Sequence, residues 1–407
     1  MPEMTDLSAP RNIGKKAGDI ASNLGNKAKN LGKNMMQKGK NMMGKLGFKT
    51  TEVNIILYIL IAMIVIGMAS YITTTLSKKQ MNCERMKNTL NDIYPTKIGN
   101  INVADSQFKH DLRDYYVKSS YNSCCAGNFK NDFVDLCPLK SVIKQGCRLL
   151  DFEIYSVNKK AVVASSAANS FNYKESYNSV DFDKVMDTVS RYAFAGSTAP
   201  NASDPLFLHF RIMSKHPYVC DQMAKSIKRN LGDRLMGSEY GNEYQGENLG
   251  AVPLKKFMGK CVIICDKQND LFEKTSLDKL VNIASGSQMM RELTNFQVVY
   301  THNYSELINY NKKHMTISTP DLKADADNVP VNVHQKYGVQ FTCMNFQTND
   351  SNLQYYEKFF NDRGYAFILK PKNLRFIPLT IKKPKKQNPE LSFGPRKIEK
   401  PYFKVNM

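Results

Sequence analysis

The first long apolar segment of the chain runs over residues 53–76 and reads VNIILYILIAMIVIGMASYITTTL. It is long enough to cross the roughly 30 Å hydrocarbon core of a bilayer. A signal peptide does not fit, because the basic region before it is too long and no small-residue cleavage site follows cleanly. A buried core helix would need a partner domain that residues 1–50 cannot supply. The pattern therefore predicts a single membrane-spanning helix.

Residues 1–50 are polar and basic, with ten Lys/Arg against three acidic residues. Leu and Met recur at heptad-like intervals over residues 24–46, with lysines between them, which is typical of a basic amphipathic helix on an anionic bilayer surface. The Gly and Asn content fits a disordered basic tail equally well. The lysines favour a cytoplasmic N-terminus, with residues 77–407 on the opposite side, although four basic residues also follow the apolar segment.

From about residue 106, short apolar runs alternate with amphipathic segments. The runs are CRLLDFEIY, AVVAS, PLFLHFRI, KCVIICD, FQVVY, GVQFTCMNF and YAFILKP. Strands that are buried on both faces and separated by helices predict an α/β fold with a parallel sheet. The length of this alternation suits a TIM-type (β/α)8 barrel, preceded by one transmembrane helix and a basic N-terminal tail.

The same pattern divides the chain into seven segments. They are a basic tail (1–50), the transmembrane helix (53–76), a juxtamembrane connector (77–105), a first half barrel (106–270), a linker (271–295), a second half barrel (296–380) and a basic C-terminal tail (381–407).

The distribution of charge along the chain predicts binding partners. The formal net charge is +20, and it is concentrated at the two ends of the chain. Polybasic ends commonly bind anionic lipid head groups or nucleic acid. Because Phe48 is the one aromatic residue in the N-terminal tail, base stacking has little support there, and nucleic acid is not an expected partner. Membrane lipids are the expected partner, and a protein partner stays open.

The nine cysteines are an odd number, so at least one thiol is free or pairs between chains. Zinc is not expected, because no C-x-x-C pair has a Cys/His partner. If the barrel lies outside the cytoplasm, the expected disulfide joins Cys124 or Cys125 to Cys137 or Cys147. The N-x-S sequons at Asn201, Asn303 and Asn349 fit a lumenal domain, but such sequons also arise by chance in an Asn-rich chain.

Four segments carry a resemblance to a known family. They are VKSSYNS (117–123), QGCRLLDFEIY (145–155), GVQFTCMNFQT (338–348) and YYEKFFNDRGYAFILKPKNLR (355–375). In order and spacing they resemble the X and Y halves of the catalytic barrel of eukaryotic-type phosphoinositide-specific phospholipase C, over residues 106–376. The resemblance implies a (β/α)8 barrel. In that family two histidines act as general acid and base, and a calcium ion activates the inositol hydroxyl.

The two histidine positions of the family fall on Tyr121 and Ser165 in this chain. A phenol with a pKa near roughly 10 stays protonated at neutral pH, and a serine hydroxyl cannot replace an imidazole as acid or base. The sequence therefore predicts no catalytic residue at either position, and it argues against phospholipase turnover.

The resemblance assigns calcium ligands to Asn122, Asp151 and Glu153, but the fourth ligand, a glutamate in the family, is replaced by Arg211. A guanidinium in that place would repel calcium and pair with the two acids. The alternative is that Arg211 points outward through a slipped strand register. No cofactor is expected, and Ca²⁺ would bind only if the residual ligands still function.

Substrate recognition is also reduced. Lys267 is the one remaining candidate for the phosphate-binding lysines of the family, and a solvated loop lysine is the alternative. Ile317 stands where the family has a head-group arginine. His209 lies two residues before Arg211 on the same strand face, where a buried, hydrogen-bonded histidine is expected rather than a relocated base.

These observations predict a single-pass membrane protein whose phospholipase C-like barrel acts as a binding or scaffolding module rather than as an enzyme. The alternative is a divergent phosphoric diester hydrolase that cleaves phosphoinositides with residual calcium ligands. The Lys-, Asn-, Tyr- and Met-rich composition fits an AT-rich genome, such as that of a large DNA virus or a protist, so a viral membrane is one expected location.

Overall fold

The structure is a computed structural model of the chain, and it describes residues 29–42, 50–378, 381, 383–388 and 391–407. The chain divides into two compact units, Met1–Asn82 and Cys83–Met407. Each unit is described by itself below.

Helix α2 (Thr50–Asn88) contains the apolar segment predicted to cross a membrane. Within it, Asn54–Thr75 has a mean hydropathy of 2.6, and none of that stretch is buried in the protein. By length and composition this stretch could cross a bilayer. Residues 29–42 of the basic tail are helical, which agrees with the amphipathic-helix alternative, whereas the rest of the predicted tail, 1–28 and 43–49, lies outside the described residues.

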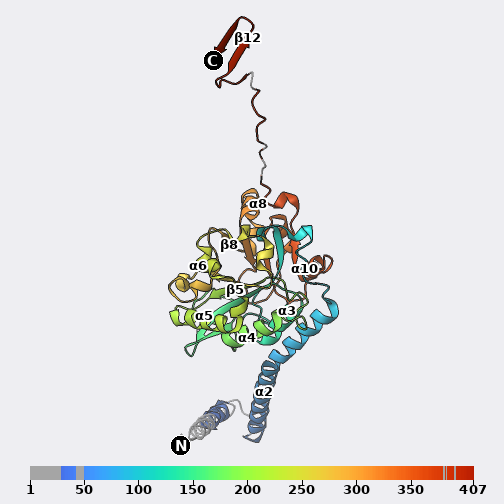
Figure 1. Cartoon of the computed structure of the whole chain (residues 1–407). Helices are drawn as coiled ribbons and strands as arrows, with labels where there is room; N and C mark the ends of the chain where they lie inside the picture. Colours follow the sequence, from blue (N-terminus) through green and yellow to red (C-terminus); the bar gives the residue numbers. More distant parts are fainter. Residues whose placement is uncertain (1–28, 43–49, 379–380, 382, 389–390) are drawn as a thin grey trace, which may run out of the picture. The chain divides into compact units, whose positions relative to one another are not determined.

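Eight parallel strands form a nearly closed barrel, which confirms the predicted TIM-type fold (Figure 1). They are β1 (Tyr115–Ser120), β2 (Leu149–Val157), β5 (Leu206–Ile212), β6 (Cys261–Asp266), β7 (Ile283–Ser285), β8 (Met290–Thr294), β9 (Met315–Thr319) and β10 (Phe341–Met344). Hydrogen bonding follows the order β7-β6-β5-β2-β1-β10-β9-β8. Functional groups in such barrels lie at the carboxyl ends of the strands.

Helices cover the outside of the barrel, and several of them begin at side-chain caps. They are α3 (Leu136–Lys144), α4 (Phe182–Ala193), α5 (Pro217–Leu231), α6 (Gly241–Tyr244), α7 (Asn295–Val299), α8 (Tyr304–Lys313), α9 (Val331–Lys336) and α10 (Ser351–Asn361). Asp135, Asp181 and Asp350 cap α3, α4 and α10 by accepting hydrogen bonds from backbone N–H groups of the first turn. These caps satisfy donors that a helix leaves unpaired at its start.

Three apolar runs predicted as strands contribute no strand to the eight-stranded barrel path. AVVAS forms β3 (Lys160–Ala164), which pairs antiparallel with β2 and with β4 (Val180–Asp181), beside the barrel path. FQVVY lies largely in helix α7, because Thr294 and Gln297 form a capping box that starts a helix there. The run YAFILKP contains β11 (Phe367–Leu369), which pairs antiparallel with β1.

The predicted linker over residues 271–295 is wrong, because this segment holds β7 and β8, two of the eight barrel strands. Both strands are short, and β7 has three residues, so neither gives the long apolar run that marks a buried strand in the sequence. The predicted C-terminal basic tail contains a hairpin of β12 (Lys397–Lys400) and β13 (Phe403–Asn406), which the sequence did not indicate.

The barrel and its helices share one large apolar core, with buried aromatic residues such as Phe152, Phe207 and Phe210. A buried ion pair lies between the barrel and its helices: Lys118 Nζ in β1 is 2.8 Å from Glu357 Oε2 in α10. Because β1 belongs to the first half barrel and α10 to the second, this pair joins the two halves.

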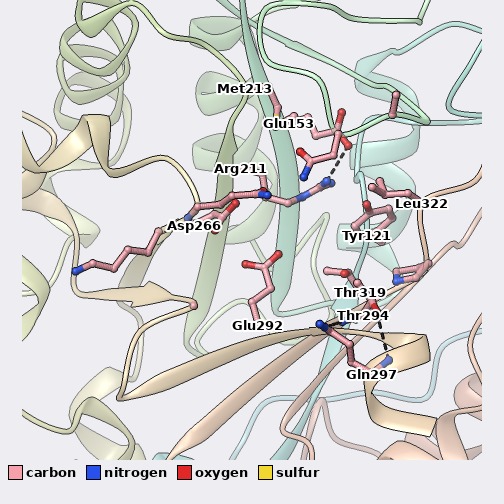
Figure 2. A pocket seen from close by; sticks show the side chains of 16 residues that line it. Tyr121, Glu153, Arg211, Met213, Asp266, Glu292, Thr294, Gln297, Thr319 and Leu322 are labelled. Carbon is pink, nitrogen blue, oxygen red and sulfur yellow. Dashed lines mark hydrogen bonds and ion pairs between the residues drawn. The ribbon is translucent and has the colours of Figure 1, made fainter. Parts of the chain in front are cut away.

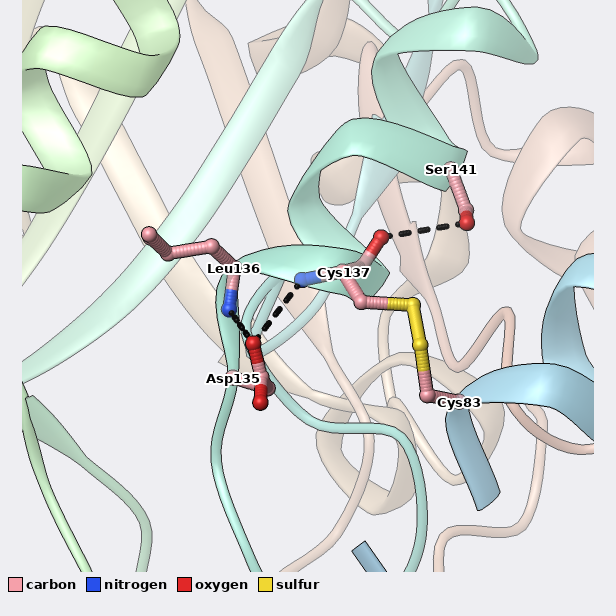
Figure 3. Close-up of a disulfide and its surroundings, with 5 residues drawn as sticks. All are labelled: Cys83, Asp135, Leu136, Cys137 and Ser141. Carbon is pink, nitrogen blue, oxygen red and sulfur yellow. Dashed lines mark hydrogen bonds between the residues drawn. A yellow bond between two sulfur atoms is a disulfide. The ribbon is translucent and has the colours of Figure 1, made fainter. Parts of the chain in front are cut away.

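The predicted disulfide is wrong. Cys137, in the first turn of α3, pairs with Cys83 near the end of α2, with 6.1 Å between the Cα atoms (Figure 3). Cys124, Cys125 and Cys147 are free thiols buried in the core. The sequence suggested near neighbours as partners, whereas the fold brings together two residues 54 positions apart.

Candidate functional site

A cavity of about 370 Å³ opens at the carboxyl ends of the barrel strands, where the family's active site would lie. Its lining includes Tyr121 after β1, Glu153 on β2, Arg211 on β5, Asp266 on β6 and Glu292 on β8 (Figure 2). The cavity is therefore surrounded by ionisable groups from five strands.

Arg211 is the centre of the charge network beside this cavity. Its Nε and Nη2 atoms donate to Asp151 Oδ2 (3.0 Å) and Oδ1 (2.7 Å), and its Nη1 donates to Glu153 Oε1 (2.7 Å). Its Nη2 also donates to Asn122 Oδ1 (3.0 Å). The side chain points inward because Arg211 pairs with Glu153 across β5 and β2, so the slipped-register alternative does not hold. All four residues that the sequence singled out around the calcium position are in contact.

The other oxygens of these carboxylates are also engaged. Glu153 Oε2 accepts from the Tyr155 hydroxyl and the Ser166 backbone N–H (2.9 Å each), and Glu153 Oε1 also accepts from Asn122 Nδ2 (3.2 Å). Calcium requires several oxygen ligands that are free to converge on one point. With a guanidinium among the oxygens and every carboxylate oxygen accepting a hydrogen bond, these residues do not fit a calcium ion.

Asp151 is held ionised. Burial would raise its pKa, but the charges of Arg211 and His209 and their hydrogen bonds hold the pKa well below its usual range. The Arg211 pKa is raised above its usual value despite burial, because Asp151 and Glu153 surround it. The pair is therefore a fixed ion pair at all physiological pH values.

Tyr121, at the first histidine position of the family, lies against this ion pair. The Arg211 guanidinium carbon is 4.4 Å from the centre of the Tyr121 ring, a cation–π contact, and the ring also meets Phe129 edge-on at 5.6 Å. Burial raises the Tyr121 pKa well above 10. The phenol therefore stays protonated and serves as a packing surface for Arg211.

Ser165, at the second histidine position, is buried and is not among the residues that line this cavity. Its hydroxyl donates to the backbone oxygen of Phe129 (3.0 Å), and its backbone N–H donates to Ser176 Oγ (3.2 Å). The structure therefore does not bring Ser165 together with Tyr121 across a substrate position.

Lys267, the predicted phosphate-binding residue, lies at the cavity edge but is paired with acids. Its Nζ is 2.9 Å from Glu273 Oε1 and 3.2 Å from Glu243 Oε1, and its side chain is 40% exposed. Ile317, at the family's arginine position, is a buried core residue of β9. An anionic head group thus meets little free positive charge from these two positions.

His209 is buried and hydrogen-bonded, as expected from the sequence, but sequence reasoning missed its partners Ser285 and Glu292. His209 Nδ1 lies 2.7 Å from Asp151 Oδ2, and its Nε2 lies 2.8 Å from Ser285 Oγ, which donates to Glu292 Oε2 (2.6 Å). Asp266 lies nearby, and burial together with the charge of Glu292 raises its pKa to about 6. Glu292 and Ser285 fall in the segment predicted as a linker, so the sequence carried no signal for them.

The His209 imidazole should make the stability of the protein depend on pH. Burial alone would lower its pKa, but hydrogen bonds to Asp151 and Glu292 and their charges raise it to about 9. Between the unfolded-state value of about 6.5 and pH 9, the folded protein binds more protons than the unfolded chain, so stability falls as pH rises. We expect a loss on the order of 3 kcal/mol across this window by urea denaturation.

His209→Gln should flatten this pH dependence, whereas the exposed His216→Gln should leave it unchanged. An identical slope for wild type and His209→Gln would contradict the assignment of a protonated His209.

The parallel barrel and the charged cavity at the carboxyl ends of its strands define a TIM-type domain with a candidate site in the usual place for this fold. The family models described as "Phosphatidylinositol-specific phospholipase C, X domain" and "Y domain" match residues 108–267 and 262–373. Together they cover residues 108–373, more than half of the chain. The chain therefore belongs to the phosphatidylinositol-specific phospholipase C family through its catalytic-type barrel.

Solved structures agree on the fold. The chain is similar to PLC21 of S. officinalis, with 17% identity and a TM-score of 0.54, and to PLC21 of L. pealei, with 18% identity and a TM-score of 0.55. In both cases the match covers 66% of this chain and 38% of the other, so the chain corresponds to well under half of those proteins. No curated protein sequence matches the chain significantly.

Proposed function

We propose that this protein is a membrane-anchored, non-catalytic member of the phospholipase C family, whose barrel serves as a binding or scaffolding module. The observation that carries the proposal is the Arg211 guanidinium, which contacts Asn122, Asp151 and Glu153, the residues that correspond to the family's calcium ligands. A fixed cation in that position supplies charge balance without the open coordination sites that a calcium-dependent reaction requires.

The available acid and base groups support the same proposal. General acid–base catalysis needs a group that changes protonation near neutral pH within reach of the substrate. Tyr121 has a raised pKa, and His209 is fully buried and engaged at both ring nitrogens. Asp266 has a pKa of about 6 and lines the cavity together with Glu292, but neither carboxyl group stands at a histidine position of the family mechanism.

The direct test is hydrolysis of phosphatidylinositol and its phosphates by the full-length protein in detergent or nanodiscs, with calcium or with a chelator. We expect no turnover above the buffer rate in either condition. Calcium-dependent turnover that Asp151→Asn abolishes would overturn the proposal and would support a divergent phosphodiesterase instead.

The membrane part of the proposal rests on α2, whose stretch Asn54–Thr75 has the length and composition of a single span. The Lys/Arg excess of residues 1–50 supports a cytoplasmic N-terminus, and with it a barrel on the opposite side of the membrane. The composition supports an origin in an AT-rich genome such as that of a large DNA virus, and hence a viral membrane as one location.

The C-terminal hairpin supports a further contact with anionic lipid. Ile398, Phe403 and Val405 share one face of the hairpin, since Ile398 lies opposite Val405 and alternate residues of a strand point the same way. Phe403 and the turn residue Tyr402 are exposed. Such two-stranded hairpins are marginally stable alone in water, so an apolar and basic hairpin suits a bilayer surface.

Replacing Lys397, Lys400 and Lys404 with Gln should weaken binding to phosphatidylserine vesicles roughly 100-fold, since each basic residue contributes about 1 kcal/mol at an anionic surface. Binding is measured by flotation of the full-length protein held in neutral nanodiscs. The control variant replaces three exposed barrel lysines, Lys184, Lys225 and Lys228, and should lose much less affinity. Equal losses for the two variants would refute a specific role of the hairpin.

A further inference from the structure

The three N-x-S sequons of the chain stand in very different surroundings. N-glycosylation joins a sugar to the Nδ2 atom of Asn, so that atom must be accessible in the folded product. The other amide atom, Oδ1, stays a hydrogen-bond acceptor after the reaction. The use of each Nδ2 and Oδ1 in the fold therefore separates sequons that can carry a glycan from those that cannot.

Asn201 cannot carry one in this fold. It is fully buried, its Nδ2 donates to the backbone oxygen of Gly146 (3.1 Å), and its Oδ1 accepts from Arg148 Nη2 (2.6 Å). No space for a glycan exists at this fully buried Nδ2, so attaching one would force Asn201 out of its packing and move its Oδ1 away from the buried Arg148 Nη2. Asn201 therefore has a structural role, and its N-x-S pattern does not mark a glycosylation site.

Asn303 has the opposite arrangement. It is exposed and caps helix α8, where its Oδ1 accepts from the backbone N–H of Glu306 (2.9 Å). No hydrogen bond from its Nδ2 is found within the part of the chain that the structure describes. Ser305, the third residue of the sequon, is exposed as well. A glycan on Nδ2 would leave the helix cap intact.

Asn349 follows the same rule. It is exposed, its Oδ1 accepts a hydrogen bond from the Tyr94 hydroxyl, and the sequon residue Ser351 is exposed at the start of α10. Its Nδ2, like that of Asn303, makes no hydrogen bond among the described residues. Both exposed sequons therefore use the oxygen for structure and leave the nitrogen open.

An independent feature points to the compartment in which this reaction takes place. Cys83 and Cys137 form a disulfide, which persists in oxidising surroundings outside the cytosol (Figure 3). Asp135 caps α3 at this position by accepting from the backbone N–H groups of Leu136 and Cys137. The bridge ties α3 to the segment that follows the apolar stretch of α2, and an oxidising compartment would preserve it.

From these two features we infer that the barrel lies in the lumenal or extracellular compartment and is N-glycosylated at Asn303 and Asn349, but not at Asn201. In the reaction, Nδ2 attacks the anomeric carbon of a lipid-linked oligosaccharide pyrophosphate. The N–C bond forms, the carbon–oxygen bond to the pyrophosphate breaks, the lipid pyrophosphate leaves, and one amide proton passes to a base of the transferase. This inference does not depend on whether the barrel is catalytic.

The test uses the full-length chain expressed in eukaryotic cells and digested with peptide-N-glycosidase. We expect the wild type to lose the mass of two glycans on digestion. Ser305→Ala and Ser351→Ala should each remove one glycan, while Asn303 and Asn349 keep their structural hydrogen bonds. Ser203→Ala, the matched control at the buried sequon, should change nothing.

Absence of any glycan from the wild type, or a glycan that Ser203→Ala removes, would overturn the inference. Mass spectrometry after alkylation of free thiols gives the second readout. We expect the disulfide to protect Cys83 and Cys137 from alkylation in the wild type. Alkylation of both residues would indicate a reducing compartment and would also overturn the inference. Such results would leave the non-catalytic proposal untouched, since that proposal is judged by lipid hydrolysis.

Discussion

Arg211→Met is expected to lower the free energy of unfolding by about 3–5 kcal/mol, because it leaves buried carboxylates without their main counter-charge. In the wild type, Arg211 donates to both oxygens of Asp151 and to Glu153. Methionine fills a similar volume but cannot pair with either acid. Urea denaturation at pH 7 measures the change.

Arg211→Glu separates the role of the cation from that of packing. This variant places a carboxylate where the family has its fourth calcium ligand, so it should be unstable without metal and gain stability when calcium is added. At a calcium concentration 100 times the dissociation constant, the gain would be about 2.7 kcal/mol. Thermal unfolding with and without calcium measures it, and neither wild type nor Arg211→Met should respond.

The matched control is Arg229→Met, which removes an exposed arginine paired with Asp183 on the surface. Its effect should be several times smaller, since exposed ion pairs contribute little. If Arg211→Met were as stable as Arg229→Met, or if the wild type were stabilised by calcium, Arg211 would not replace the metal.

Lys118→Met is the second substitution with a large expected effect. Lys118 Nζ donates to Glu357 Oε2 and to the backbone oxygen of Gln145 (2.8 Å each), and both charged side chains are fully buried. Removing the lysine leaves Glu357 in the core without its counter-charge, which should cost about 3–5 kcal/mol of stability. Burial raises the Glu357 pKa despite the lysine, so the variant should be least stable at high pH, where the lone carboxyl must ionise.

The double variant Lys118→Met/Glu357→Leu should recover most of this loss, because it replaces a buried ion pair with apolar side chains. Urea denaturation of the two single variants and the double variant forms a complete cycle. Lys358→Met, which removes an exposed pair with Asp362 on the outer side of α10, is the control and should change little. A double variant no more stable than Lys118→Met would show that the pair has a role beyond charge compensation.

Much of the fold was predictable because the barrel repeats one strong pattern. Apolar runs such as KCVIICD and PLFLHFRI became β6 and β5, and each is buried on both faces. The prediction failed where an element was too short for a pattern, as in β7, or where a local cap outweighed an apolar run, as Thr294 did at the start of α7. The Cys83–Cys137 bridge could not be predicted, because sequence spacing does not constrain which distant residues meet.

The sequence by itself determined which groups are present at the site: a phenol and a hydroxyl at the histidine positions, and an arginine beside two acids. These follow from residue identity, since neither a phenol nor an aliphatic hydroxyl has the ordinary pKa of an imidazole. Only the tertiary structure decided which charged side chains pair with one another. The register of β2 against β5 sets Arg211 beside Glu153, and closure of the barrel brings Glu292 from β8 to His209 on β5. Because an ion pair depends on distances of a few ångströms between separate strands, its partners are decided by packing and not by sequence alone.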